Sequence, residues 1–238
     1  MENYNELVGI VCDTEVLSQR SDEINVVTEA EELKQIAKDM KKAVYDYNLA
    51  SLAAIQINVP RRVFAINFKG DIRIYVNPII TKSVGFEISE ETCSSIPNKR
   101  FIIPRANKIV LTYQTTSGKV ENKEFVGMSA KVVQHCIDHL EGVLLSDIGF
   151  EIDENWDKAS DDEKAEVIKY YLDSIQTTTK ELNAEIEKDD NLKQMNDAID
   201  FLEKMQKGEV QVTYETVTKE NNGSEHNRTN TTEEDGQS

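Results

Sequence analysis

Two segments of this chain repeat apolar side chains every three or four positions, a pattern typical of a helix with one buried face. The first segment covers residues 30–47, and the second covers residues 129–140 with Ser129 as the expected N-cap. The apolar positions of the first are Leu33, Ile36, Ala37, Met40, Ala43, Val44 and Tyr47. Those of the second are Val132, Val133, Cys136, Ile137, His139 and Leu140. We expect an amphipathic helix over each segment.

Between these two segments the pattern changes to short runs rich in β-branched residues, with turn residues between them. The runs cover residues 63–67, 72–76, 79–84 and 108–112. We interpret Asn77-Pro78 as a stop between the second and third runs. Helices and short strands in one stretch predict a mixed α+β domain over residues 1–150.

From about residue 151 a narrower apolar stripe replaces this pattern, with steps of four and three. The stripe positions are Ile168, Leu172, Ile175, Thr179, Leu182 and Ile186 and, after a break at residues 188–191, Leu192, Met195, Ile199 and Leu202. We expect an acidic α-helical extension over residues 151–207, as a hairpin or a coiled-coil-like pair. Residues 208–238 are predicted to hold one short strand, at 210–214, and a disordered tail.

The net charge of −17 lies mostly in the C-terminal part of the chain. Residues 151–238 carry 24 acidic against 10 basic side chains, whereas residues 1–150 carry 20 against 17. Neither part has the basic face that nucleic-acid binding requires, and no apolar run approaches the ~20 residues of a membrane helix. The three cysteines are too scattered to predict a disulfide framework. We therefore expect a cytosolic protein without nucleic-acid or membrane partners.

The most informative local feature is a pair of histidines on the second predicted helix. His135 and His139 are four positions apart, so they share one helix face and can bind one divalent metal. In H-E-x-x-H metalloenzymes a glutamate that acts on the bound water follows the first histidine, and here that residue is Cys136. Cys93 is a candidate third ligand, although a small buried thiol is an equally good interpretation. The pattern alone also allows the two histidines to be ordinary helix side chains.

Three collinear segments resemble the signature motifs of peptide deformylases, metallohydrolases that remove the formyl group from the N-terminal methionine of new bacterial and organellar proteins. Residues 49–56 (Leu-Ala-Ser-Leu-Ala-Ala-Ile-Gln) resemble G-x-G-L-A-A-x-Q. Residues 91–97 (Glu-Thr-Cys-Ser-Ser-Ile-Pro) resemble E-G-C-L-S-x-P, and residues 134–140 (Gln-His-Cys-Ile-Asp-His-Leu) resemble Q-H-E-x-D-H-L. The similarity runs over residues 7–150. It implies a fold with antiparallel strands around a metal-bearing helix. It also implies a protein of the bacterial cytosol, encoded either by the cell itself or by a phage.

The resemblance also implies roles for particular side chains. Cys93, His135 and His139 match the ligands of one divalent metal, Fe(II) or Zn(II). The Gln56 side-chain amide and the backbone N–H of Ser94 match the groups that bind the developing oxyanion.

Asp138 matches an acidic position that orients a ligand histidine. Ser51, Glu91, Thr92 and Arg100 match positions in or near the groove for an N-formylated peptide or nascent chain.

The departures from these motifs fall on the catalytic and substrate-binding positions. Cys136 replaces the glutamate that serves as general base, and Leu49, Ser51 and Thr92 replace glycines. One hypothesis is therefore a deformylase-type hydrolase with reduced or altered activity. The alternative is a catalytically inactive homologue that serves as a metal-stabilised protein-binding or assembly component, with self-association or partner binding through residues 165–205. A thiol switch between Cys93 and Cys136 is a third, minor hypothesis.

Overall fold

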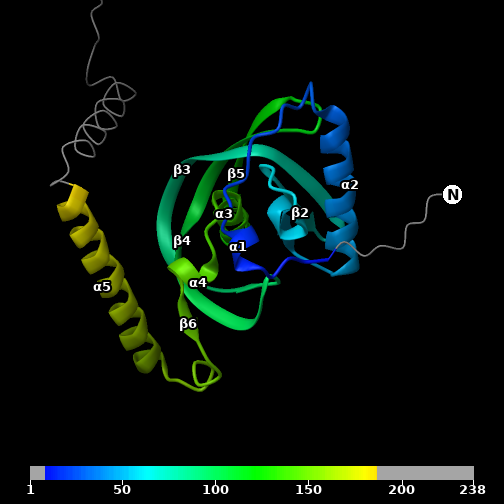
Figure 1. Cartoon of the computed structure of the whole chain (residues 1–238). Coiled ribbons are helices and arrows are strands. Elements are labelled where there is room, and N and C mark those ends of the chain that lie inside the picture. The colour runs from blue at the N-terminus through cyan, green and yellow to red at the C-terminus, as the bar shows by residue number, and fades with distance from the viewer. Residues whose placement is uncertain (1–8, 187–238) are drawn as a thin grey trace, which may run out of the picture. The chain divides into compact units, whose positions relative to one another are not determined.

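The computed structural model describes residues 9–186, with side chains through residue 177. Its centre is a six-stranded sheet in the order β1-β2-β3-β4-β5, with β6 paired to β4, and every pairing is antiparallel (Figure 1). The strands are β1 (Ser51–Ala53), β2 (Val63–Phe68), β3 (Asp71–Cys93), β4 (Ile96–Gln114), β5 (Val120–Val126) and β6 (Phe150–Ile152). The predicted α+β class with antiparallel strands is confirmed.

The helices are α1 (Thr14–Leu17), α2 (Ala30–Asp46), α3 (Met128–Glu141), α4 (Leu145–Ile148) and α5 (Asp161–Ile186), with a 3₁₀ turn η1 (Ala54–Ile57). Both predicted amphipathic helices are present, as α2 and α3. The N-cap assigned to Ser129 is wrong, because α3 begins at Met128 with Gly127 as its N-cap. Gly127 has a φ of 61° and donates its N–H to the Asn107 carbonyl, while the Ser129 hydroxyl donates to the Val126 carbonyl.

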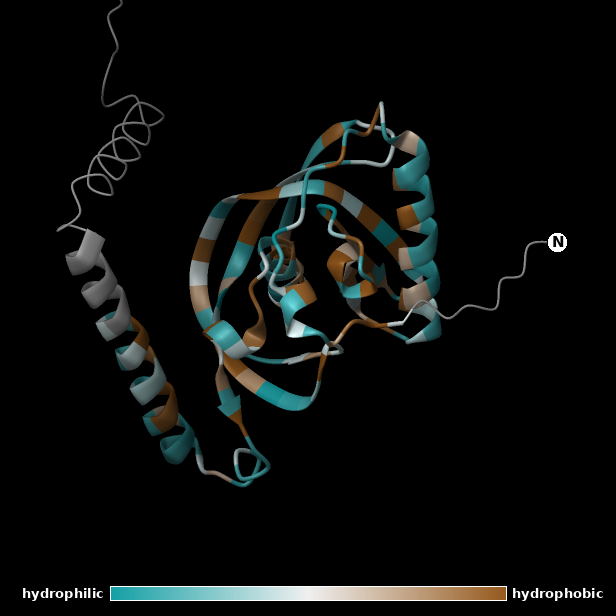
Figure 2. Ribbon diagram, in the orientation of Figure 1, coloured by the Kyte–Doolittle hydropathy of each residue, from teal (hydrophilic) through white to brown (hydrophobic). Residues whose placement is uncertain are grey.

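Helices α2 and α3 pack on opposite faces of strand β2. Along β2, Val63 and Ala65 belong to the apolar cluster of α2, whereas Phe64 and Ile66 belong to the cluster that includes α3. Side chains alternate between the faces of a strand, so a strand covered on both faces is apolar throughout. This explains the uninterrupted apolar run of β2, and Figure 2 shows the one-sided apolar face of α2.

Strand β3 does not stop at Asn77-Pro78, contrary to the prediction. It runs from Asp71 to Cys93, pairing with β2 up to Val76 and with β4 from Val76 onward, and the β4 pairing has register shifts at Val76/Ile79, Ile80/Lys82 and Glu91/Cys93. Asn77 adopts a left-handed φ of 46°, and its side chain both accepts from the Ile24 N–H and donates to the Ile24 carbonyl. The dipeptide is therefore a β-bulge, stabilised by a partner that is distant in sequence.

The C-terminal end of α3 is fixed by close contact with the chain after α1. Gly142 caps the helix with a φ of 75°, and a Cβ at this position would lie 2.4 Å from the Ser18 carbonyl oxygen. Only glycine fits both the left-handed conformation and this approach. The contact holds the helix that carries both candidate histidines against the domain.

The compact unit that contains the predicted α+β domain continues to Ser174, and the domain boundary at residue 150 stays a prediction. Strand β6 pairs with β4, and Trp156 and Tyr171 are buried against Ile102 and Ile152. The Tyr171 hydroxyl donates to the Ile148 carbonyl. The start of the predicted stripe thus packs on its own domain.

Several expectations for the C-terminal part fall beyond residue 186. The second helix, the strand at residues 210–214 and the tail at residues 208–238 lie outside the described residues. Among the described helices, none combines the length and apolarity that a membrane crossing requires.

Candidate functional site

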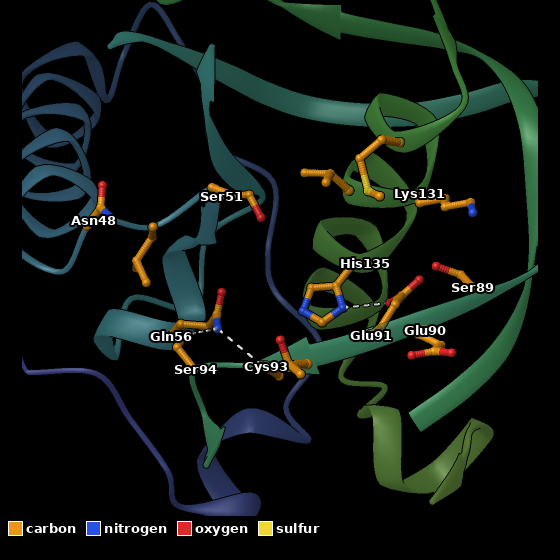
Figure 3. A pocket seen from close by; sticks show the side chains of 15 residues that line it. Asn48, Ser51, Gln56, Ser89, Glu90, Glu91, Cys93, Ser94, Lys131 and His135 are labelled. Atoms are coloured by element: carbon orange, nitrogen blue, oxygen red, sulfur yellow. Dashed lines mark hydrogen bonds and ion pairs between the residues drawn. The ribbon is translucent and has the colours of Figure 1, made fainter. Parts of the chain in front are cut away.

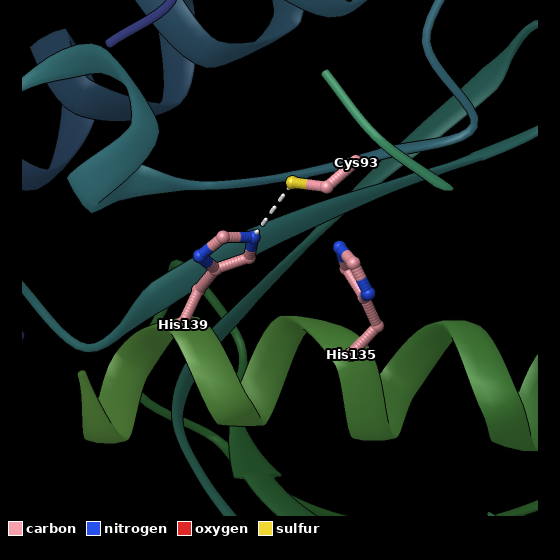
Figure 4. A group of neighbouring side chains, drawn as sticks. All are labelled: Cys93, His135 and His139. Atoms are coloured by element: carbon pink, nitrogen blue, oxygen red, sulfur yellow. Dashed lines mark hydrogen bonds between the residues drawn. The ribbon is translucent and has the colours of Figure 1, made fainter. Parts of the chain in front are cut away.

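Three potential metal ligands converge from two elements. Cys93 is the last residue of β3, and His135 and His139 project from successive turns of α3 toward it (Figure 4). One ligand atom from each residue lies within 4.8 Å of the others, and Cys93 Sγ is 3.2 Å from His139 Nε2. Ligand atoms around a tetrahedral zinc ion are about 3.5 Å apart, so only a small contraction is needed. A thiolate and two imidazoles suit a transition metal.

The protonation of this cluster favours metal binding by the sulfur. Burial raises the pKa of the Cys93 thiol, but hydrogen bonds from His135 and His139 outweigh burial and hold that pKa at about 5. Burial lowers the pKa of His135, but hydrogen bonds with Cys93 and Glu91 raise it to about 9. In the metal-free chain the cluster is therefore a thiolate beside an imidazolium. Metal binding must then release the proton of His135.

A buried ion-pair network holds His135 in place. His135 Nδ1 donates to Glu91 at 3.1 Å, which leaves Nε2 free to face a metal. Arg105 donates to both carboxylate oxygens of Glu91, at 2.8 and 2.9 Å, and to Asp138 at 2.6 Å. Burial raises the pKa of Glu91, but Arg105 and His135 overcome this and hold it at about 2. His139 differs, because its buried Nδ1 has no hydrogen-bond partner among the described residues.

This network revises two expectations about carboxylates. Asp138 was expected to orient a ligand histidine, but it accepts a hydrogen bond from Arg105, and Glu91 is the residue that contacts His135. No role was assigned to Arg105 from the sequence. The available signal was the position of Arg105 directly after the apolar run Phe101-Ile102-Ile103-Pro104, which indicates a buried side chain. A buried guanidinium requires carboxylate partners.

Gln56 is buried in η1 with both ends of its amide engaged. Its Oε1 accepts from the Ala53 N–H at 2.9 Å. Its Nε2 donates to Ser95 Oγ at 3.1 Å and to Ser94 Oγ at 3.4 Å, and lies 3.6 Å from Cys93 Sγ. The donor end of the amide therefore points to the Cys93 side of the cluster.

A cavity of about 470 Å³ opens beside these groups (Figure 3). Its wall is formed by residues 48–51, by the end of β3 and by one face of α3. The predicted site residues that line it are Ser51, Gln56, Glu91, Thr92, Cys93, Ser94 and His135. One wall thus carries two of the three candidate ligands and the Gln56 amide.

Cys136 does not line this cavity. Its side chain is 1% exposed and belongs to the apolar cluster around α3. Burial raises the pKa of the Cys136 thiol to about 12, and a hydrogen bond with the Ser51 side chain opposes this only in part. Ser51, the hydrogen-bond partner of the thiol, does line the cavity. The residue at the expected general-base position is therefore a neutral, enclosed thiol.

The placement of Arg100 near the substrate groove is not supported by the structure. Arg100 lies on β4 opposite Ile152, and its guanidinium donates twice to Asp157, at 2.8 and 2.9 Å. It is not among the residues that line the cavity. No local sequence pattern indicates this pairing, because Asp157 lies in the predicted C-terminal extension.

Comparison with known proteins agrees with this geometry. The family described as polypeptide deformylase matches residues 9–152. A peptide deformylase of Pseudothermotoga lettingae is 37% identical over 134 residues, which is 56% of this chain and 77% of that protein. The crystal structure of the Thermotoga maritima peptide deformylase matches with a TM-score of 0.56 and 31% identity, over 60% of this chain and 98% of that one. The Met-Ala-Ser-bound peptide deformylase of Acinetobacter baumannii matches with a TM-score of 0.55 and 25% identity, over 60% and 99%.

Proposed function

Because this chain belongs to the polypeptide deformylase family, we propose that it is a metal-dependent hydrolase acting on the N-formyl group of N-terminal formyl-methionine in nascent peptides, with turnover reduced by Cys136. The observation that carries the proposal is the convergence of Cys93, His135 and His139 beside the Gln56 amide. A cavity large enough for a short peptide adjoins this cluster.

The three ligands would hold one divalent ion, Fe(II) or Zn(II), which when bound lowers the pKa of water and polarises a carbonyl. Glu91 keeps the His135 ring oriented through its hydrogen bond to Nδ1, and Arg105 keeps Glu91 ionised. Gln56 is held at its acceptor end by the Ala53 N–H, and an oxyanion would replace the serine hydroxyls that its Nε2 now donates to. The backbone N–H of Ser94 is the second donor in this proposal.

Proton transfer is the step that this site performs poorly. A positioned general base contributes typically ~10²–10⁴-fold to a rate. Cys136 is buried, and it is not among the residues that line the cavity. We therefore expect slow hydrolysis that depends on the metal and the oxyanion donors.

The same observation favours a second candidate, a catalytically inactive homologue that binds a protein partner. The C-terminal extension would supply the contact surface in that case. Since Ile168 and Tyr171 already pack on the domain, such a surface within residues 165–205 would begin after Leu172. Self-association through this segment is the simplest form of the hypothesis.

The test is formate release from formyl-Met-Ala-Ser by the full chain, loaded anaerobically with Fe(II) and compared with Cys93→Ala. Slow release by the wild type, abolished in Cys93→Ala, is the expected result. Metal content measured on the same samples should fall in the variant. No release by a wild-type sample with one bound metal would favour the inactive homologue instead.

A further inference from the structure

The C-terminal extension touches the wall of the candidate cavity through the chain's single tryptophan. Trp156 is 7% exposed and packs with Ile102, Ile152 and Tyr171. Its indole N–H donates to Glu90 Oε1 at 2.6 Å, and Glu90 lies on β3 among the residues that line the cavity (Figure 3). A residue outside the family's motifs therefore fixes the position of a carboxylate at the cavity wall.

Glu90 differs from the other charged residues of this wall. Glu91 is neutralised by Arg105, and Lys131 pairs with Glu87 at 2.9 Å. Glu90 accepts from a neutral indole, and its second oxygen has no hydrogen-bond partner among the described residues. The one carboxylate of this wall without a direct ion pair is therefore held in a fixed position.

Arg100 is the cation that most directly opposes the charge of Glu90. The hydrogen bond and charge of Asp157 raise the pKa of Arg100, with a further contribution from the charge of Glu90. However, the guanidinium donates twice to Asp157 and does not line the cavity. A positive group arriving through the cavity would therefore meet a carboxylate that has no ion-pair partner among the described residues.

We propose that Glu90, positioned by Trp156, makes this site prefer peptides with a basic side chain next to the N-terminal methionine. This inference rests on the proposed function, since it assigns a substrate preference to the same cavity. A carboxylate already fixed by a short hydrogen bond loses little freedom on binding. Because the side chain is solvent-exposed, we expect only about a threefold to tenfold difference between basic and acidic peptides.

The experiment measures binding rather than turnover, so that the missing general base does not limit it. The Zn(II)-loaded full chain is titrated calorimetrically with the tripeptides Met-Lys-Ser, Met-Ala-Ser and Met-Glu-Ser. Emission of the single tryptophan provides a second, local signal for the wild type. Glu90→Gln retains an acceptor for the indole but removes the charge. Glu124→Gln is the matched control, because Glu124 is exposed, pairs with Lys108 and lies outside the cavity lining.

We expect Met-Lys-Ser to bind most tightly and Met-Glu-Ser least tightly to the wild type and to Glu124→Gln. The order should disappear in Glu90→Gln. In Trp156→Phe the dissociation constant of Met-Glu-Ser divided by that of Met-Lys-Ser should fall toward one. Loss of stability alone would not produce this change.

Equal binding of the three peptides, or the same order in Glu90→Gln, overturns this inference and leaves the proposed function standing. Binding of none of the three to the wild type overturns both.

Discussion

Restoring a glutamate at position 136 should restore turnover only if Ser51 is also removed. Cys136 is 1% exposed and does not line the cavity, whereas the Ser51 side chain to which its thiol is hydrogen-bonded does line it. Glutamate adds three heavy atoms at a closely packed position, and such overpacking costs typically ~1–3 kcal/mol. Ser51→Gly removes the hydroxyl that contacts the thiol, and this gives a longer side chain at position 136 more room toward the cavity. The single variant Cys136→Glu should therefore be destabilised and gain little activity.

The double variant should gain most of the contribution of a general base. We expect kcat/KM on formyl-Met-Ala-Ser to rise by about 10²–10⁴-fold over the wild type, measured as formate release with Fe(II) under anaerobic conditions. The control is Ser51→Gly with Cys136→Gln, which has nearly the same shape without a base. If the variant with both Ser51→Gly and Cys136→Glu is no faster than the wild type, this reasoning is refuted. An equal gain in the glutamine control would show that space, and not proton transfer, limits the rate.

Three further predictions concern the stability of the fold. Arg105→Met leaves the carboxylates of Glu91 and Asp138 without their buried partner, so the free energy of unfolding in urea should fall by about 3–5 kcal/mol; a loss below ~1 kcal/mol would contradict the network. The folded pKa of Glu91, about 2, is depressed from 4.5, so its stabilisation is present above pH 4.5 and is lost as the pH falls toward 2. The urea midpoint of the metal-free wild type should therefore drop more steeply over this range than that of Glu91→Gln, and parallel curves would argue against it. A chain ending at residue 150 lacks the buried side chains of Trp156 and Tyr171, so its free energy of unfolding should be lower than that of a chain ending at residue 174 by at least ~3 kcal/mol. Equal melting temperatures of the two chains would show that residues 151–174 add nothing to stability.

The sequence by itself determined the features that depend on local periodicity and on short motifs. The apolar spacing placed α2 and α3 to within a residue or two, because a helix packed on a sheet must bury one face. The four-residue spacing of His135 and His139 put both imidazoles on one side of α3. The motif around Cys93 supplied the third member of the cluster, since the resemblance covered its neighbours as well.

Only the tertiary structure decided the features that join segments distant along the chain. Asn77-Pro78 is compatible with a stop or a bulge, and its contact with Ile24 selects the bulge. The same dependence on distant partners assigns Glu91 to His135 and Arg100 to Asp157. No local pattern specifies such pairings, because the free energy of a buried charge depends on which partner the fold brings within hydrogen-bonding distance.

Access to the site was also a tertiary property. From the sequence, Cys136 was a substituted general base, and its chemical identity suggested weak catalysis. The fold adds that the thiol is buried in contact with Ser51 and that Trp156 of the C-terminal extension fixes Glu90 at the cavity wall. The sequence specifies which residue stands at each position. The solvent exposure of a side chain and its neighbours arise only when the strands and helices pack, and in this protein they determine which side chains can contact a substrate.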